Sequence, residues 1–367
     1  KWRRNSGCGI VTGVKKRREP PLPFFDKLRE AVIGKPRDPL HPETRHNLAL
    51  VAFLAWIGLG ADGLSSACYG PEEAFLALGQ YTHFGLYLAA ATFLTVFVIA
   101  LSYNQVIELF PSGGGGYKVA TQLLGPRAGL ISGSALLVDY VLTIAISIAA
   151  GVDALFSLLP PGAQPYKLMT ETGLGIVLVM LNLRGLKESI RVLLPIFLGF
   201  FVTHAFLIVY GVVAHAEGLP RLIPDTITET ENLTQQMGWM FAVSLFLRAY
   251  SLGGGTYTGL EAVSNNVNML TEPRVRTGRY TMLYMAGSLS FTAGGVILLY
   301  LLWNAQPVAH QTLNAVTFHA IIGSWNLDPA LSHGLLAIVL LLEAGLLFVA
   351  ANTGFLSGPK VLANMAV

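Results

Sequence analysis

Long hydrophobic runs separated by short polar stretches dominate the chain from about residue 47 onward. Eight of these runs come close to, or exceed, the roughly 20 residues that a helix needs to cross the bilayer core. They lie near residues 48–78, 84–109, 127–158, 170–184, 190–214, 238–270, 280–303 and 332–357. This pattern predicts an all-α membrane protein. Stretches rich in proline, glycine or polar residues predict loops at 111–113, 160–162 and 220–236.

Two of the predicted spans contain glycine-rich interruptions. The first reads GLGADG over residues 58–63, and the second reads GGGTYTG over residues 253–259. A helix broken inside the bilayer exposes backbone N–H and C=O groups that lipid cannot satisfy. Such breaks are tolerated only where protein or a water-filled cavity surrounds them. Paired breaks in two halves of a membrane chain therefore indicate a transporter with a central substrate site.

The two interruptions fall in the first and the sixth predicted spans. That spacing predicts a repeat of five helices, and the second copy is inverted in the membrane because five is an odd number. The chain then divides into a first transmembrane repeat at 47–214 and a partial second repeat at 238–367. The second repeat is two helices short, so we interpret the fold as truncated after the eighth helix.

The composition agrees with a membrane protein, and the charges indicate its orientation. Hydrophobic residues make up 53% of the chain and charged residues only 12%, against about a quarter charged in ordinary soluble domains. Residues 1–46 are basic and proline-rich, which predicts a cytoplasmic tail near anionic lipid rather than a nucleic-acid binder.

Basic residues outside the tail gather in loops on one predicted side of the membrane. These residues are Lys118, Arg127, Arg184, Lys187, Arg191, Arg274, Arg276, Arg279 and Lys360. The other side carries Lys167 and Arg221, and its loop over 215–237 is acidic. The positive-inside rule then predicts a cytoplasmic N-terminus, and we expect a multi-pass protein of the plasma membrane.

A polar stripe runs along the third predicted span. Asp139, Thr143 and Ser147 recur every four residues, and Tyr140 precedes Thr143 by three. Helical periodicity places all four on one face. Thr143 and Ser147 alone would be equally consistent with bonds to their own backbone or with close packing. An acid in mid-membrane costs about 2.5–3.5 kcal/mol on insertion scales, so Asp139 favours a functional polar site.

The two interruptions contribute further oxygen-bearing side chains. Asp62 lies in the first, with Tyr69 two helical turns further on, and Thr258 and Glu261 lie one turn apart at the second. Carboxylates, hydroxyls and freed carbonyls are the ligands that hard cations prefer. Because His and Cys do not cluster with them in the sequence, a transition metal is disfavoured. Asp62 would also repel the carboxylate of an amino-acid substrate.

Three carboxyls in one dry cavity cannot all stay ionised without strong desolvation and repulsion. We predict that Glu261 carries the coupling proton. Glu343 in the eighth span is consistent with either a proton relay or a helix–helix hydrogen bond. His204 is predicted to be packed or hydrogen-bonded, and Glu72 with Glu73 to form a solvated rim.

Several segments together resemble a known transporter family. They are residues 61–73 (ADGLSSACYGPEE), 111–117 (PSGGGGY), 139–143 (DYVLT), 182–189 (NLRGLKES), 257–265 (YTGLEAVSN) and 351–353 (ANT). The chain resembles the amino acid–polyamine–organocation (APC) superfamily, and more narrowly the KUP- and KimA-type potassium–proton symporters.

The resemblance implies a LeuT-like inverted repeat and import of potassium coupled to protons. It further implies potassium coordination by Asp62, Tyr69, Asp139, Tyr140, Thr143, Ser147, Thr258 and Glu261. The expected partners are the lipid bilayer and a small cation, with no nucleic acid, no resident cofactor and no enzyme activity. A homodimer is left open.

Three alternatives remain open at this point. An amino-acid permease of the same superfamily would lack an acid at the first interruption, so Asp62 argues against it. A membrane aspartyl protease also pairs an Asp-Tyr-like motif with a glycine-rich Asp. Here the order is reversed, and Ala61 separates Gly60 from Asp62. The third alternative is a non-transporting sensor on the same fold.

Overall fold

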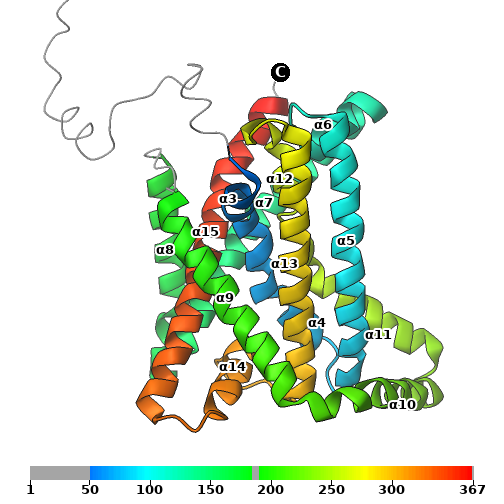
Figure 1. Ribbon diagram of the computed structural model, residues 1–367, viewed down its shortest axis with the longest axis vertical. Coiled ribbons are helices and arrows are strands. Elements are labelled where there is room, and N and C mark those ends of the chain that lie inside the picture. Colours follow the sequence, from blue (N-terminus) through cyan, green and yellow to red (C-terminus); the bar gives the residue numbers. More distant parts are fainter. Residues whose placement is uncertain (1–49, 184–189, 366–367) are drawn as a thin grey trace, which may run out of the picture. The chain divides into compact units, whose positions relative to one another are not determined.

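The fold is helical throughout the described part of the chain (Figure 1). The computed structural model describes residues 50–183 and 190–365, so the predicted tail at 1–46 and the loop basic residues Arg184 and Lys187 lie outside the described residues. The α-helices are α3 (Ala52–Ser65), α4 (Gly70–Leu76), α5 (Gly85–Leu109), α6 (Gly115–Val119), α7 (Pro126–Phe156), α8 (Lys167–Leu183), α9 (Ile190–Ala214), α10 (Leu219–Met237), α11 (Trp239–Leu252), α12 (Glu261–Asn265), α13 (Arg274–Leu302), α14 (Leu313–Gly323) and α15 (Pro329–Met365).

Several of these helices are long enough to span a membrane. Within the described residues, five segments have the length and apolar composition of a span, namely Thr82–Leu109, Pro126–Phe156, Val192–Ala214, Arg274–Leu302 and Pro329–Pro359. Helix α8 has 17 residues, and the other two predicted spans are discontinuous. The structure thus agrees with the predicted multi-pass helical protein, and the helices lie close to the predicted ranges.

The first discontinuity lies later in the sequence than the glycine pattern predicts. Helix α3 continues unbroken through residues 58–63, and the break falls at the 3₁₀ turn η1 (Ser66–Cys68) and Tyr69. Asp62 therefore lies in the last turn of α3 and not in the break itself. The glycines allow close packing instead: a Cβ on Gly60 would lie 3.3 Å from the Trp56 ring and 3.4 Å from Met285.

The second discontinuity is where the sequence predicts it. Helix α11 ends at Leu252, and residues Gly253–Tyr257 form the 3₁₀ segment η6. Thr258 is extended, Gly259 has φ +84°, and α12 begins at Glu261. The left-handed backbone at Gly259 favours glycine because a Cβ would strain it.

The predicted loop at 220–236 is wrong, because this stretch forms helix α10. Pro220 falls in the first turn, where a missing N–H costs little. Leu222, Thr226 and Leu233 are buried along one side while the rest of the helix is polar. The many polar residues thus reflect a half-exposed amphipathic helix. Helix α14 also occupies a stretch for which the sequence predicts no helix.

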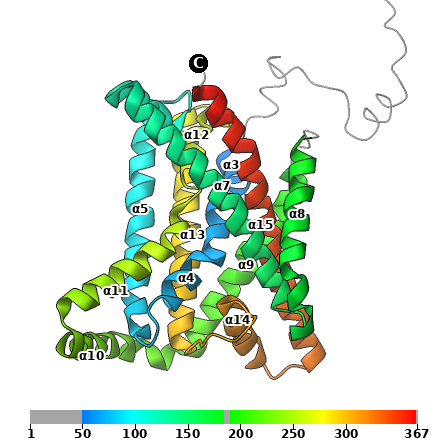
Figure 2. The same ribbon diagram turned by 180° about the vertical axis from the view of Figure 1, so that it is seen from behind.

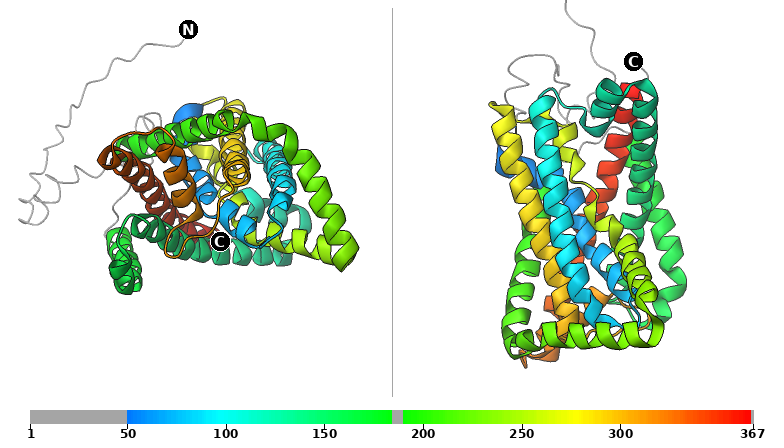
Figure 3. Two further views of the ribbon diagram at one scale, coloured as in Figure 1. Left: turned by 90° about the horizontal axis from the view of Figure 1, so that it is seen from below. Right: turned by 90° about the vertical axis from the view of Figure 1, so that its right-hand side faces the viewer.

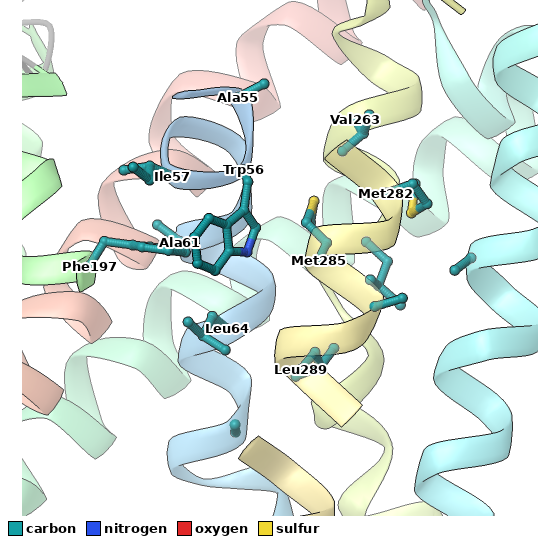
Figure 4. Packing of buried hydrophobic residues seen from close by; sticks show 14 of the residues in the cluster. Ala55, Trp56, Ile57, Ala61, Leu64, Phe197, Val263, Met282, Met285 and Leu289 are labelled. Atoms are coloured by element: carbon teal, nitrogen blue, oxygen red, sulfur yellow. The ribbon is translucent and has the colours of Figure 1, made fainter. Parts of the chain in front are cut away.

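The first broken segment is surrounded by other helices. Helix α3 packs against α13, α15 and α9, while α7 runs along α15 and α5 along α13 (Figures 1 and 2). Figure 3 shows the blue residues of this segment between the yellow part of the chain and the red end of α15. The Trp56 ring on α3 meets the Phe197 ring edge-on at 4.8 Å, and its Nε1 donates to Ser288 Oγ over 3.0 Å. Figure 4 shows Trp56 between Phe197 and Met285.

Candidate binding site at the two helix breaks

The two broken segments touch each other through glycines. A Cβ on Gly259 would lie 2.3 Å from the Gly63 nitrogen, and a Cβ on Gly70 would lie 2.1 Å from Thr256 Oγ1. Both distances are far inside van der Waals contact, so only glycine fits at these points. The Ser66 hydroxyl lies 2.6 Å from the Gly63 carbonyl oxygen and 2.8 Å from that of Thr256. The breaks are therefore joined by close backbone contact and by the Ser66 hydroxyl, whose single proton is shared between the two carbonyl oxygens.

Three carboxylates gather beside this crossing. Asp62 is 4% exposed and Glu261 is 9% exposed. The charge of Asp62 interacts with those of Glu261 and Asp139. Asp62 Oδ1 is buried and has no hydrogen-bond partner within the described residues. A buried carboxylate oxygen without a donor is strongly unfavourable unless a proton or a cation compensates it.

Tyr69 and Thr258 form a further side-chain contact between the two breaks. The Tyr69 hydroxyl is hydrogen-bonded to the Thr258 side chain. Thr258 Oγ1 also donates to the Gly255 carbonyl over 2.9 Å. The Tyr69 ring also lies against Gly255, where a Cβ would be 2.9 Å from a ring carbon. Two further predicted site residues are thus in direct contact.

The polar stripe of α7 faces the protein interior, as its spacing predicts. Tyr140, Thr143 and Ser147 are buried and Asp139 is half-buried, whereas the intervening Val141 is 66% exposed. Tyr140 interacts electrostatically with Asp62, Asp139 and Glu261. This arrangement brings Tyr140 and Asp139 to the carboxylates of the breaks.

Ser147 lies further along the same face of α7. It is fully buried, and its Oγ has no hydrogen-bond partner within the described residues. Two of the eight predicted ligands, Ser147 and Asp62, thus keep a buried oxygen that no group in the described part of the chain contacts by a hydrogen bond.

The glycine-rich stretch 111–117 supports the end of the second break. Gly114 N donates to the Asn265 carbonyl over 3.3 Å, and a Cβ on Gly115 would lie 1.8 Å from Asn265 Oδ1. Asn265 Nδ2 in turn donates to the Tyr140 hydroxyl over 3.4 Å. The stretch therefore positions α12 against α7. The glycines are evident in the sequence, but this contact could not be predicted from it, because residues 111–117 and Asn265 are far apart along the chain.

Two cavities reach the site residues from different directions. One, of about 670 Å³, is lined by Tyr69, Gly255 and residues just before α14. The other, of about 230 Å³, is lined by Tyr140, Asn265 and residues of α6 and α15. Helix α14 and helices α6 and α12 lie at opposite ends of the helices in Figure 1. The site thus lies between two separate openings.

Two further predictions concern acids near these openings. Glu73 is exposed, but Glu72 is half-buried, and its Oε1 accepts from the Leu313 nitrogen at the start of α14 over 2.9 Å. The prediction of a solvated rim is therefore wrong for Glu72, which caps α14. His204 is packed and hydrogen-bonded as predicted, with Nδ1 3.0 Å from the Phe200 carbonyl oxygen.

Comparison with known proteins identifies the class. Residues 64–367, which make up most of the chain, match the family of amino acid permeases. The chain belongs to this family of the APC superfamily, a family of membrane transporters and not of enzymes. The aspartyl protease alternative is therefore wrong.

One curated relative is similar over nearly the whole chain. The chain is 31% identical over 350 residues to the potassium transporter KimA of Bacillus subtilis (strain 168). The alignment covers 94% of this chain and 54% of the relative. The chain thus spans about half the length of the curated relative that it matches.

Proposed function

We propose that this protein is a secondary transporter that carries potassium across the plasma membrane together with protons. The proposed ligands are Asp62, Tyr69, Asp139, Tyr140, Thr143, Ser147, Thr258 and Glu261. The observation that carries the proposal is the buried Asp62 Oδ1, which has no donor in the described residues and lies beside two further carboxylates. A bare potassium ion at this point would balance one of these charges, and a proton on Glu261 would remove another.

The charges at the site favour a cation over an amino acid. None of the ion pairs found in the described part of the chain joins Asp62, Asp139 or Glu261 to a lysine or arginine. The carboxylate of an amino-acid substrate would be repelled by all three acids. Carboxylate and hydroxyl oxygens with freed carbonyls replace the water shell of an alkali cation. The printed name of the Bacillus relative supports potassium as that cation.

The two openings and the broken helices support transport by alternating access. An inverted repeat places the substrate site between its two halves, so that rocking of one half exposes the site to each side in turn. In the proposed cycle the cation enters through one cavity, beside Tyr69, and leaves through the other, beside Tyr140. Glu261 carries the coupling proton, because it begins α12 at the break and is shielded from bulk water.

The second candidate function is transport of an amino acid, which the family description favours. Thermal unfolding of the purified full-length protein separates the two. A ligand that binds only the folded state stabilises it by about 2.7 kcal/mol at one hundred times its dissociation constant. We expect stabilisation by potassium and rubidium chloride beyond that of choline chloride. Stabilisation by neutral amino acids without any by potassium would refute the proposal.

A further inference from the structure

A buried histidine and a buried glutamate, neither of them among the proposed cation ligands, face each other. His204 on α9 and Glu343 on α15 are each 1% exposed, and His204 Nε2 lies 3.5 Å from Glu343 Oε2. Neither of these two atoms has a hydrogen-bond partner within the described residues. Both residues lie in membrane spans, where ionisable side chains are costly and usually functional.

The remaining hydrogen bonds fix how many protons the pair needs. His204 Nδ1 lies 3.0 Å from the Phe200 carbonyl oxygen, which only accepts, so Nδ1 carries a hydrogen. In a neutral imidazole the opposite nitrogen, Nε2, then has a lone pair and no hydrogen. An ionised Glu343 also only accepts. The two facing atoms can therefore form a hydrogen bond with each other only when one further proton is present, on Nε2 or on Oε2.

A single side chain connects this pair to the first helix break. Asn314 Nδ2 donates to Glu343 Oε1 over 3.0 Å and to the Cys68 carbonyl oxygen over 3.2 Å. Its Oδ1 accepts from the Tyr300 hydroxyl over 2.5 Å, which holds the amide in place. Cys68 ends the 3₁₀ turn η1, so its carbonyl belongs to the break itself. The charge on Glu343 therefore acts on the break through one amide group.

The pair also has a route for protons. Glu343 lines the cavity of about 670 Å³ that reaches Tyr69. The titratable groups that interact with Glu343 from neighbouring elements are Cys68 on η1, Glu72 on α4 and Tyr300 on α13. Asp153 on α7 and Lys167 on α8 line the same cavity and form an ion pair with each other. The facing group from α14 is the neutral Asn314. A proton entering from the cavity is thus the charge that balances Glu343.

We propose that His204 and Glu343 form a proton-binding site, separate from the cation site, that exchanges one proton with this cavity. Loss of the proton leaves two acceptors facing each other and a full charge on Glu343. That charge draws Asn314 Nδ2 toward Glu343 and weakens its bond to the Cys68 carbonyl. The effect on transport rests on the proposed function, whereas binding of the proton does not.

The variant Glu343→Gln removes the carboxyl group that can exchange a proton but keeps the size and shape of the side chain. Its amide nitrogen supplies a permanent donor for His204 Nε2, and its carbonyl oxygen still accepts from Asn314. The variant therefore resembles the protonated pair at every pH. The matched control is Tyr300→Phe, which removes another hydrogen bond of the same network. An ordinary tyrosine hydroxyl titrates only near pH 10, so this control removes no group that exchanges a proton near neutrality.

The decisive measurement is the thermal unfolding midpoint of the full-length protein in potassium-free buffer from about pH 5 to 8.5, spanning the ordinary titration range of histidine. On this proposal the folded pair holds one proton that the unfolded chain releases as pH rises, so stability should fall as pH rises. We expect the unfolding midpoint of the wild type to decrease as pH rises through this range. In Glu343→Gln the part of this decrease that comes from the pair should be absent. Tyr300→Phe should unfold at a lower temperature throughout but keep the wild-type pH dependence. A Glu343→Gln protein with the wild-type pH dependence would overturn the proposal.

A second measurement separates this inference from the proposed function. Potassium should stabilise Glu343→Gln as much as wild type, because Glu343 is not among the proposed cation ligands. If potassium stabilises neither protein, the cation proposal fails, and the pH comparison still tests the pair. If potassium stabilises both, rubidium uptake into proteoliposomes by Glu343→Gln should depend less on external pH than wild-type uptake. Unchanged dependence on external pH would refute the role in transport.

Discussion

Gly259 in the second helix break lies directly against Gly63 in the last turns of α3. A Cβ on Gly259 would come within 2.3 Å of the Gly63 nitrogen and 2.7 Å of its Cα. The backbone of one break thus rests on the helix that carries Asp62, one residue from Gly63. This contact sets how far Asp62 lies from Glu261, which follows Gly259 by two residues. Any side chain at Gly259 would push the two acids apart.

Gly259→Ala should therefore unfold or inactivate the protein. The positive φ of +84° alone costs a residue with a Cβ about 1–2 kcal/mol, and the overlap with backbone atoms adds to this cost. The matched control is Gly254→Ala in the same break, where a Cβ would meet nothing within 4 Å. Thermal unfolding and cation uptake measured on both variants provide the test. Equal behaviour of the two would contradict the close crossing.

Ser66→Ala tests the hydrogen bond between the two breaks. It leaves the Thr256 carbonyl without the hydroxyl that reaches it from the first break, and a buried unsatisfied group costs about 1–3 kcal/mol. Ser65→Ala is the control, because among the described residues its hydroxyl donates only to Asp62 O within α3. We expect a larger drop in the unfolding midpoint for Ser66→Ala. A drop no larger than that of Ser65→Ala would show that the bridge contributes nothing.

Asp62→Asn and Asp139→Asn test the cation site. Each change removes one of the charges that the proposed cation balances, while the shape of the side chain is kept. We expect both variants to reach the membrane at normal levels and to lose cation uptake. The measurement is rubidium uptake by cells that lack their own potassium uptake systems. Uptake with wild-type affinity in both variants would exclude these residues as ligands.

Glu261→Gln tests the coupling of cation and proton. The amide mimics a permanently protonated carboxyl, so potassium can still bind while the proton can no longer leave. Stabilisation by potassium should persist, and accumulation driven by an imposed pH gradient should fail. Proteoliposomes with and without that gradient provide the measurement. If Glu261→Gln responds to the gradient as wild type does, another group carries the proton, and Glu343 is the next to test.

The sequence by itself determined the helical spans and the face of α7 that carries the polar stripe. Both depend on local spacing: the run length set by the bilayer, and the helical period that places Asp139, Tyr140, Thr143 and Ser147 together. The second break was also predictable, because three consecutive glycines within an apolar run strongly disfavour a continuous helix.

Only the tertiary structure decided where the first break lies and what its glycines do. Glycine weakens a helix by only about 1 kcal/mol, so packing around residues 58–63 can keep α3 helical when neighbouring backbones approach closely. The same holds for Glu343. Its spacing along α15 could not reveal that His204 and Asn314, from two other helices, would meet its two oxygens. Local sequence encodes helices and their faces, but contacts between distant helices depend on how those faces pack.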